Sequence, residues 1–368
     1  MHRTDAPGNA SNLFTDGNAG TGTPATEIEQ HSLNAFQEEL CNLVEGNGVT
    51  LVKDTNTQVR DIMALLYATV QPGGRLTLST AVPVTTTDVT SQTTVYYTPH
   101  KSDKIPLYNG TRWQLYTFAE LSQATTDSTK SPAAVANNSN YDMFVWSDSG
   151  TLRCTRGPAW TSDTARGTGA GTTELELLNG RYVNHVAVTN GPAAQRGLYV
   201  GTIRSDGSAQ ANDSKAKRHV WNTYNRAARA MSVVEATDTW TYSTATFRQA
   251  NASAANQLDF VIGLSEDLVR ASIKATSTAS AGTNVTSTVA VGLDSTSVKA
   301  TDCINSTSTG CSTNSVQNAT PTAEYLGFPG LGRHTLVWLE QASGATTTWQ
   351  GDNGGTVVQS GIAGTVGA

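Results

Sequence analysis

Short runs in which apolar and polar residues alternate dominate residues 73–118. In GGRLTLSTAVPVTTTDVTSQTTVYYTPHKSDKIPLYNGTRWQLYTF, Leu76 and Leu78 alternate with polar neighbours, and residues 95–97 and 113–116 repeat the pattern. The second of these runs follows a turn at Tyr108-Asn109-Gly110. A period of two places apolar side chains on one face of a strand, so the pattern predicts a small antiparallel meander.

Two helices are predicted before this stretch. Residues 32–48 (SLNAFQEELCNLVEGNG) carry apolar side chains at helical spacing and end at Gly46-Asn47-Gly48, a left-handed stop. Residues 54–74 (DTNTQVRDIMALLYATVQPGG) begin with a capping box of Thr55 and Gln58. We expect a helical hairpin. Its apolar stripes are too wide for one partner helix, so we expect further burial against a strand, a symmetry mate or a neighbouring protein.

Residues 1–26 precede the helices and contain one apolar pair, Leu13-Phe14. Such a segment cannot bury enough apolar surface to fold alone. It is either a flexible leader or a segment that becomes ordered by docking onto a neighbour, with Phe14 as the anchor.

Alternating runs and turns continue beyond residue 118. Asn179-Gly180, between ELELL and RYVNHVAV, is the strongest hairpin signal in the chain. We therefore predict that residues 74–231 form a β-sandwich or barrel-like connector. We predict that residues 232–368 form a jelly-roll-like β-sandwich with polar loops. The predicted fold is mainly β, with a small N-terminal α-helical region in residues 1–73.

Composition supports strands over helices and limits the partners. Charged residues make up 15% of the 368 residues, against a usual share of about 25%, and the net charge is −6. An acidic chain argues against binding nucleic acid through phosphate neutralisation. No apolar run approaches the length of about 20 residues that a membrane helix needs, and the N-terminus has no apolar signal-peptide core. We expect a soluble protein without membrane insertion.

The four cysteines do not form a disulfide scaffold in a chain of this length. Cys41 lies on a helical apolar stripe and Cys154 on a strand face, so both are interpreted as packing residues. Cys303 and Cys311 lie close together in the polar segment CINSTSTGC, and the sequence leaves open whether they form a local disulfide.

The residues nominate no catalytic centre, cofactor site or metal site. Glu174 and Glu176 share one face of a strand, which is typical of a solvated strand and also of a glycosidase carboxylate pair. The six histidines have no ligand spacing, and no nucleophile or phosphate-binding motif is present. We therefore predict a protein that is not an enzyme.

Two clusters of binding-type residues have alternative interpretations. One is a basic cluster with two aromatic residues: Lys215, Lys217, Arg218, Arg226 and Arg229, with Trp221 and Tyr224. We favour packing of the aromatic rings and contacts of the arginines with backbone carbonyls or a neighbouring subunit over binding of an acidic ligand. A lectin-like site needs an exposed aromatic face with polar groups beside it. Four aromatic residues are candidates for such a site by residue type alone, and each is either a glycan contact or a core residue: Trp240, Tyr242, Trp338 and Trp349.

Several phrases resemble a module of tailed-bacteriophage tail-fibre and other virion structural proteins. They are GRLTL, VPV, VYYTP, LYNGTRW and YTFAELS, followed by LYVGTIRSDGSAQ and AKRHVWNTYNRAARAM. GTPAT, LNAFQEELCNLVE and NTQVRDIMALL also resemble the N-terminal attachment region of phage tail fibres. The usual Trp-Leu pair of that region is Ser32-Leu33 here.

The resemblance implies a virion protein of the tail, synthesised in the host cytoplasm, as a tail fibre or baseplate-associated fibre. It implies a homotrimer attached to other tail or baseplate proteins by its N-terminus, with a C-terminal domain that contributes to recognition of a host-surface glycan or protein. A tailspike-like glycan depolymerase and a head or collar fibre are the alternatives. The predicted attachment or subunit-contact residues are Phe14, Leu33, Phe36, Leu40, Val59, Ile62 and Met63.

Overall fold

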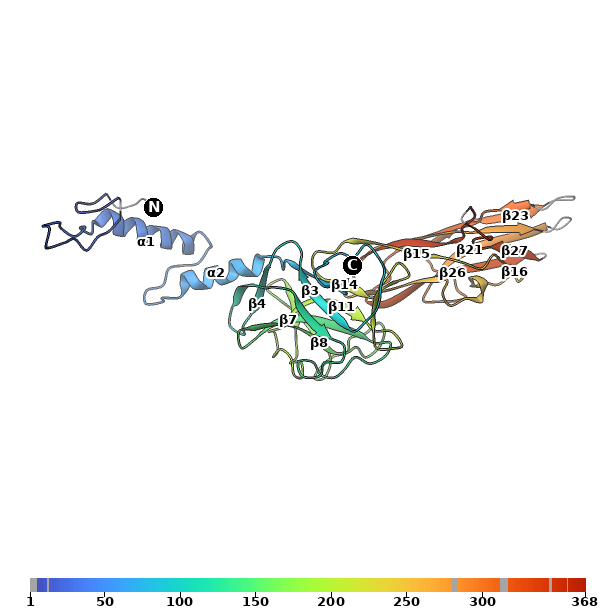
Figure 1. Ribbon diagram of the computed structural model, residues 1–368, viewed down its shortest axis with the longest axis horizontal. Helices are drawn as coiled ribbons and strands as arrows, with labels where there is room; N and C mark the ends of the chain where they lie inside the picture. The colour runs from blue at the N-terminus through green and yellow to red at the C-terminus, as the bar shows by residue number, and fades with distance from the viewer. Residues whose placement is uncertain (1–4, 12, 280–283, 312–316, 344–345, 356) are drawn as a thin grey trace. The chain divides into compact units, whose positions relative to one another are not determined.

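The computed structural model describes residues 5–11, 13–279, 284–311, 317–343, 346–355 and 357–368 (Figure 1). The chain forms two compact units. Unit 1 is Met1–Val70 with Thr111–Gln114, and unit 2 is Gln71–Gly110 with Leu115–Ala368. Strands dominate unit 2, which also contains the short 3-10 helix η1 (Ala250–Ala252), and both described α-helices lie in unit 1. The prediction of a mainly β protein with a small N-terminal helical region is confirmed.

Unit 1 contains helices α1 (Gln30–Glu45) and α2 (Gln58–Thr69). The predicted stop after α1 is confirmed, because Gly48 adopts a φ of +76° and its N–H donates to the carbonyl of Glu45. The predicted capping box is wrong. The Gln58 side chain instead donates to the carbonyl of Thr50 at 2.8 Å and accepts from the N–H of Val52 at 3.0 Å, so it fixes the segment before α2.

Unit 2 begins with a three-stranded antiparallel sheet in the order β1-β3-β6 and a six-stranded sheet in which β8-β7-β11-β10-β9 is extended by β14. The bounds in the three-stranded sheet are β1 (Gly74–Thr77), β3 (Thr94–Pro99) and β6 (Leu121–Ala124). Strands β4 (Lys104–Tyr108) and β5 (Trp113–Thr117) follow β3. The six-stranded sheet contains β7 (Asn140–Asp148), β8 (Thr151–Ala159), β9 (Leu175–Leu178), β10 (Arg181–Asn184), β11 (Leu198–Arg204) and β14 (Val220–Asn222).

Three further sheets contain most of the chain beyond residue 210. The eight-stranded sheet contains β2 (Val89–Gln92), β12 (Ala211–Asp213), β13 (Lys217–Arg218), β17 (Arg248–Gln249), β18 (Gln257–Ile262), β21 (Asn284–Leu293), β23 (Thr307–Cys311) and β26 (Gly332–Ser343). The five-stranded sheet has the order β15 (Ala228–Val234), β28 (Gly361–Gly367), β19 (Val269–Lys274), β25 (Thr322–Gly327) and β22 (Cys303–Asn305). The four-stranded sheet has the order β16 (Thr239–Tyr242), β27 (Thr347–Gln350), β20 (Thr276–Ala279) and β24 (Gln317–Ala319). Within the described residues, no sheet closes into a barrel.

The hairpin predicted at Asn179-Gly180 is confirmed. Arg181 pairs with Leu178 across the turn, and both turn residues have positive φ values, 49° and 79°. This geometry is that of a type I′ turn, whose twist matches the twist of the two strands.

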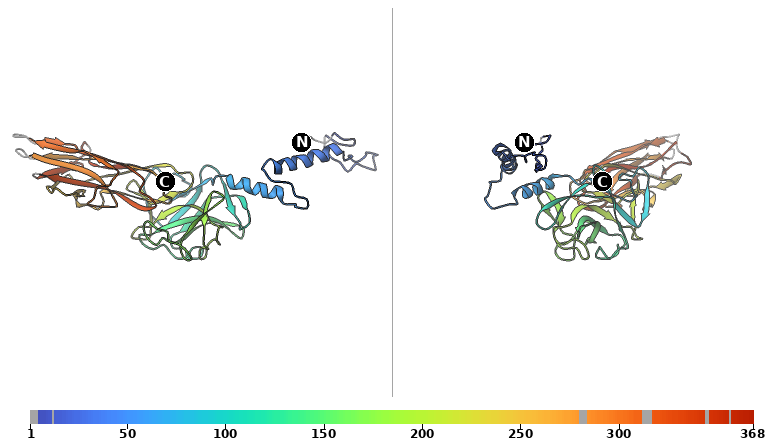
Figure 2. Two further views of the ribbon diagram at one scale, coloured as in Figure 1. Left: turned by 180° about the vertical axis from the view of Figure 1, so that it is seen from behind. Right: turned by 60° about the vertical axis from the view of Figure 1, so that its left-hand side comes forward.

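The boundary predicted between residues 231 and 232 lies inside β15, which pairs along its whole length with β28. The eight-stranded sheet also crosses this boundary, because β13 pairs in parallel with β18. Unit 2 is therefore one compact body. Figure 2 shows the strands after residue 228 running side by side in both views.

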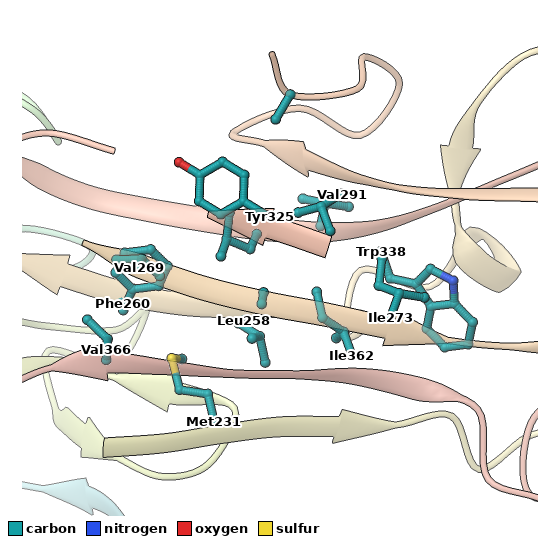
Figure 3. Packing of buried hydrophobic residues seen from close by; sticks show 14 of the residues in the cluster. Met231, Leu258, Phe260, Val269, Ile273, Val291, Tyr325, Trp338, Ile362 and Val366 are labelled. Carbon is teal, nitrogen blue, oxygen red and sulfur yellow. The ribbon is translucent and has the colours of Figure 1, made fainter. Parts of the chain in front are cut away.

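The main core lies between the eight-stranded and five-stranded sheets (Figure 3). Leu258, Phe260, Val291 and Trp338 come from the first sheet, and each is at most 1% exposed. The facing residues from the second sheet are Met231, Val269, Ile273, Tyr325, Ile362 and Val366. Each buried aliphatic or aromatic side chain of this kind contributes about 1.5 to 3 kcal/mol. The same buried cluster continues to Phe144, Tyr199 and Trp221, so it also joins the earlier strands to this body.

Partly buried ion pairs add a polar connection across the same body. Arg333 on β26 binds Asp259 on β18 through two hydrogen bonds of 2.9 Å, and it lies 3.9 Å from Asp163. Asp163 also accepts from Arg204 on β11 at 2.7 Å. His219 Nε2 lies 3.3 Å from Asp259. Segments from residues 163 to 333 therefore meet in one charged network.

We predict that the Asp259→Asn variant loses about 3 kcal/mol of unfolding free energy at pH 7, because Arg333 loses its buried counter-charge. Burial alone would raise the pKa of Asp259, but His219 and Arg333 outweigh it and hold the pKa below its ordinary value. The carboxylate therefore stabilises the fold above about pH 4, and this contribution is lost as the pH falls further.

Urea unfolding of both proteins at pH 7 and at pH 3 measures this difference. The difference in unfolding free energy between wild type and Asp259→Asn should be smaller at pH 3 than at pH 7. Equal stabilities at pH 7 would contradict an ionic contribution from this network.

Candidate functional site

Three of the four aromatic residues considered as glycan contacts belong to the core. Trp338 and Trp349 are completely buried, and Trp240 is 8% exposed. The reason is register, because Trp240 pairs directly with Trp349 across β16 and β27 and both rings point to the inner face of the sheet. Trp240 then packs edge-on against Trp338, with 6.0 Å between ring centroids. Of the two alternatives, glycan contact or core, these three residues take the second, since no face of their rings is free for stacking.

Tyr242 differs, because its ring is only half-buried at the end of β16. The guanidinium of Arg248 lies 3.9 Å from the ring centroid, and the phenol donates to the carbonyl of Thr246 at 2.8 Å. Arg248 also donates to Glu340 at 2.8 Å. These contacts hold Tyr242 and Arg248 in fixed positions at one edge of the four-stranded sheet.

Glu340 is the buried acceptor beneath this edge. It is completely buried, and it accepts from Trp240 Nε1 at 2.7 Å and from the N–H of Asn251 at 3.1 Å. Burial raises the pKa of the Glu340 carboxyl, against the opposing effects of Trp240 and Arg248. The carboxylate of Glu340 holds Trp240, Arg248 and the backbone of Asn251 in place, so the geometry assigns it a structural role.

The predicted basic cluster is mainly a set of internal ion pairs. Arg218 donates to the carbonyl of Ala230 at 2.7 Å, which confirms the predicted contact with backbone. Asp213, which the sequence analysis missed, receives Arg218 and Arg229, each at 2.8 Å. Asp213 precedes Arg218 by five residues across the β12–β13 turn, and this short spacing was the available signal.

The aromatic part of that cluster also packs inward. Trp221 is completely buried, and its Nε1 donates to Asp267, which also pairs with Arg226. The prediction that these aromatics pack is confirmed for Trp221.

A groove that the sequence analysis did not predict lies at one end of the five-stranded sheet. Its volume is about 470 Å³, and Arg226 and Arg270 contribute polar groups. Leu268 and Leu326, which also line it, are 49% and 56% exposed. Strand alternation could have indicated the exposed side of this groove, because Tyr325 points into the core and its neighbour Leu326 therefore points outward.

The predicted attachment residues divide into exposed and buried sets. Phe14, Leu33, Phe36 and Leu40 are exposed in the single chain. Val59 and Met63 are half-buried, and Ile62 is buried. The apolar face of α1 is therefore exposed along two turns, whereas the apolar stripe of α2 is already partly buried within the chain.

The remaining chemical candidates show no convergent site. Glu176 bonds His185 at 2.9 Å and raises the pKa of that imidazole, while Glu174 accepts from the N–H of Gly169. Cys303 is a buried free thiol that accepts from the N–H of Val291. Cys154 is buried and Cys41 is half-buried, as expected for packing residues. Among the described residues, no three His, Cys, Asp or Glu side chains are grouped to hold a metal ion.

The described helices include none with the length and apolar character to cross a membrane.

Similarity to known proteins is partial. A protein of Escherichia coli (strain K12), named Uncharacterized protein StfP, is 39% identical over 82 residues, which represent 20% of this chain and 39% of that protein. The match therefore spans less than half of that relative. No protein-family model matches the chain.

Solved structures show only remote likeness. The insecticidal delta-endotoxin Cry8Ea1 and the mosquito-larvicidal Cry4Aa toxin, both from Bacillus thuringiensis, are 7% and 10% identical, with TM-scores of 0.20 and 0.18. These matches cover 83% and 77% of this chain and 55% and 50% of the toxin chains. At these TM-scores they carry no argument about fold or function.

We predict that the Asp213→Asn variant unfolds with about 3 kcal/mol less free energy than wild type, because two buried guanidinium groups lose their shared carboxylate. Urea unfolding followed by tryptophan fluorescence measures the loss. The control is Glu324→Gln, since the Arg270–Glu324 pair is 3.6 Å apart with both side chains more than 60% exposed. That change should alter stability by about 0.5 kcal/mol or less. Equal effects of the two substitutions would refute a structural role for the cluster.

Proposed function

We propose that this chain is a structural subunit of a bacteriophage tail, as a tail fibre or baseplate-associated fibre attached through its N-terminal unit. It has no enzymatic role, and its C-terminal strands contribute to contact with the host surface. The observation that carries the proposal is the exposed apolar face of α1, together with the sequence segments between residues 22 and 231 that resemble phage virion proteins.

The face of α1 needs a cover. Leu33 and Phe36 are 57% and 56% exposed on successive turns, and Leu40 continues the same stripe. Apolar stripes of this kind mark contact surfaces in soluble proteins. Burying the exposed parts of the three side chains contributes about 3 kcal/mol per subunit. A homotrimer in which symmetry mates cover one another's stripes supplies this burial.

The N-terminal segment also has a charge that suits attachment. Residues 4–52 contain seven Asp and Glu residues and no Lys or Arg. A neighbouring tail protein with a basic surface around an apolar pocket complements this charge. Phe14, which is 57% exposed, is the apolar anchor for that pocket.

The two facing layers of unit 2 fit the proposed role of a rigid body beyond the attachment region. We interpret the layers after residue 231 as a jelly-roll-like β-sandwich, and the sheets of residues 74–231 as a β-sandwich connector joined to it. The shared core and the buried ion pairs support this interpretation, because both oppose hinge motion within unit 2.

We predict a solution mass of three times 38.7 kDa for the intact protein, measured by light scattering at micromolar concentration. The double variant Leu33→Gln/Phe36→Gln should shift the mass toward the monomer, because each glutamine puts an amide into the apolar seam. The control is Val357→Gln, a residue that is 98% exposed in the other unit.

Circular dichroism of each variant checks that the helices persist. A monomeric wild-type protein would reject the self-sufficient trimer, as would a double variant that stays trimeric.

A further inference from the structure

Three large apolar side chains are exposed together at one end of the five-stranded sheet. Leu268 directly precedes β19, and Leu326 is the last residue but one of β25. Phe328 directly follows β25, and because Val269 pairs with Gly327, Leu268 and Phe328 flank the same pair of strand ends. The three exposed fractions are 49%, 56% and 66%. Together Leu268, Leu326 and Phe328 form the apolar end cluster, and its two leucines line the groove described above.

The local backbone directs this cluster away from the core. Val269 and Tyr325 point into the core (Figure 3), so their neighbours Leu268 and Leu326 point outward. Pro329 fixes its own φ and restricts the backbone of Phe328 before it, which lowers the entropy cost of presenting the ring. Among the described residues of unit 2, Phe328 is the one exposed aromatic. A ring presented in this way is typical of an anchor in a protein interface.

The charges along the groove are already matched. Arg226 pairs with Glu266 and Asp267, and Arg270 lies 3.6 Å from Glu324. A charged ligand therefore meets guanidinium groups that have carboxylate partners, and it gains no unpaired counter-charge there. An apolar surface is the better match, because it displaces water from the exposed leucines and leaves the ion pairs intact. A second copy of this chain brings such a surface without an excess of like charge.

The polypeptide enters unit 2 beside this groove. Asn225 Nδ2 donates to the carbonyls of Pro72 and Gly74 at 2.7 and 2.9 Å, and the next residues, 226–228, line the groove. Residues 72–74 come directly after α2 in the chain. Copies that are joined through α1 are therefore tethered at this end of unit 2. A tether raises the effective concentration of one apolar end cluster near another, so a modest contact area is sufficient.

We propose that the apolar end cluster and its groove form a second contact between copies of this chain, in which the cluster of one copy packs against the equivalent cluster of another. The inference rests on the proposed trimer that is joined through α1. In a closed symmetric assembly, residues beside the axis meet their own equivalents, so one cluster per copy is enough. This contact joins the β-rich bodies, whereas α1 joins the N-terminal units.

Cysteine cross-linking of the intact protein tests this contact. Brief oxidation with diamide should link Phe328→Cys into disulfide-bonded dimers at least tenfold faster than Leu177→Cys. Leu177 is the matched control, because it is 62% exposed and lies on β9 of the six-stranded sheet, outside the groove. The wild-type protein, treated in the same way, measures the background from the native cysteines, and circular dichroism checks that each variant is folded.

Light scattering on the same samples separates failure of this contact from failure of the trimer. A trimeric protein in which Phe328→Cys cross-links no faster than Leu177→Cys would overturn the contact and leave the trimer in place. A monomeric protein would overturn both. A dimeric mass with selective cross-linking at Phe328→Cys would support the contact and reject the trimer.

Discussion

The pairing of Arg333 with the buried carboxylate of Asp259 is the contact on which the organisation of unit 2 depends. It joins β26 to β18, and through Asp163 it reaches Arg204 on β11, so strands from the middle and the end of the chain share one set of charges. A buried charge is costly without its partner, and this cost discriminates against arrangements in which the two sets of strands separate. Hydrophobic burial stabilises the layers, while the ion pairs favour one relative placement of them.

Hydroxyl-rich surfaces follow from the same layered design. Strand alternation sends large apolar side chains inward, and the outward positions of this chain are mostly Thr, Ser, Asn and Gln rather than Lys and Glu. Such a surface stays hydrated without a strong electric field.

Local features were predictable from the sequence, and long-range pairings were not. The Asn179-Gly180 turn and both helices follow from short-range periodicity and turn chemistry. The pairing of β15 with β28 joins residues more than a hundred positions apart, and no local sequence pattern indicates this pairing. The burial of Trp338 and Trp349 depends on which face of each strand meets the core, so residue type alone left open whether they are core residues or glycan contacts. The capping box failed because Gln58 found partners at Thr50 and Val52.

The placement of β28 between β15 and β19 has a mechanical consequence. Ladder hydrogen bonds run across strands, so a pull directed along the strands loads all of them together in shear, whereas a pull across the ladder would open them one at a time. Seven residue pairs join β28 to β15, and five more join it to β19. The final strand thus acts as a clamp between its neighbours, suited to a part that must bear tension without lengthening.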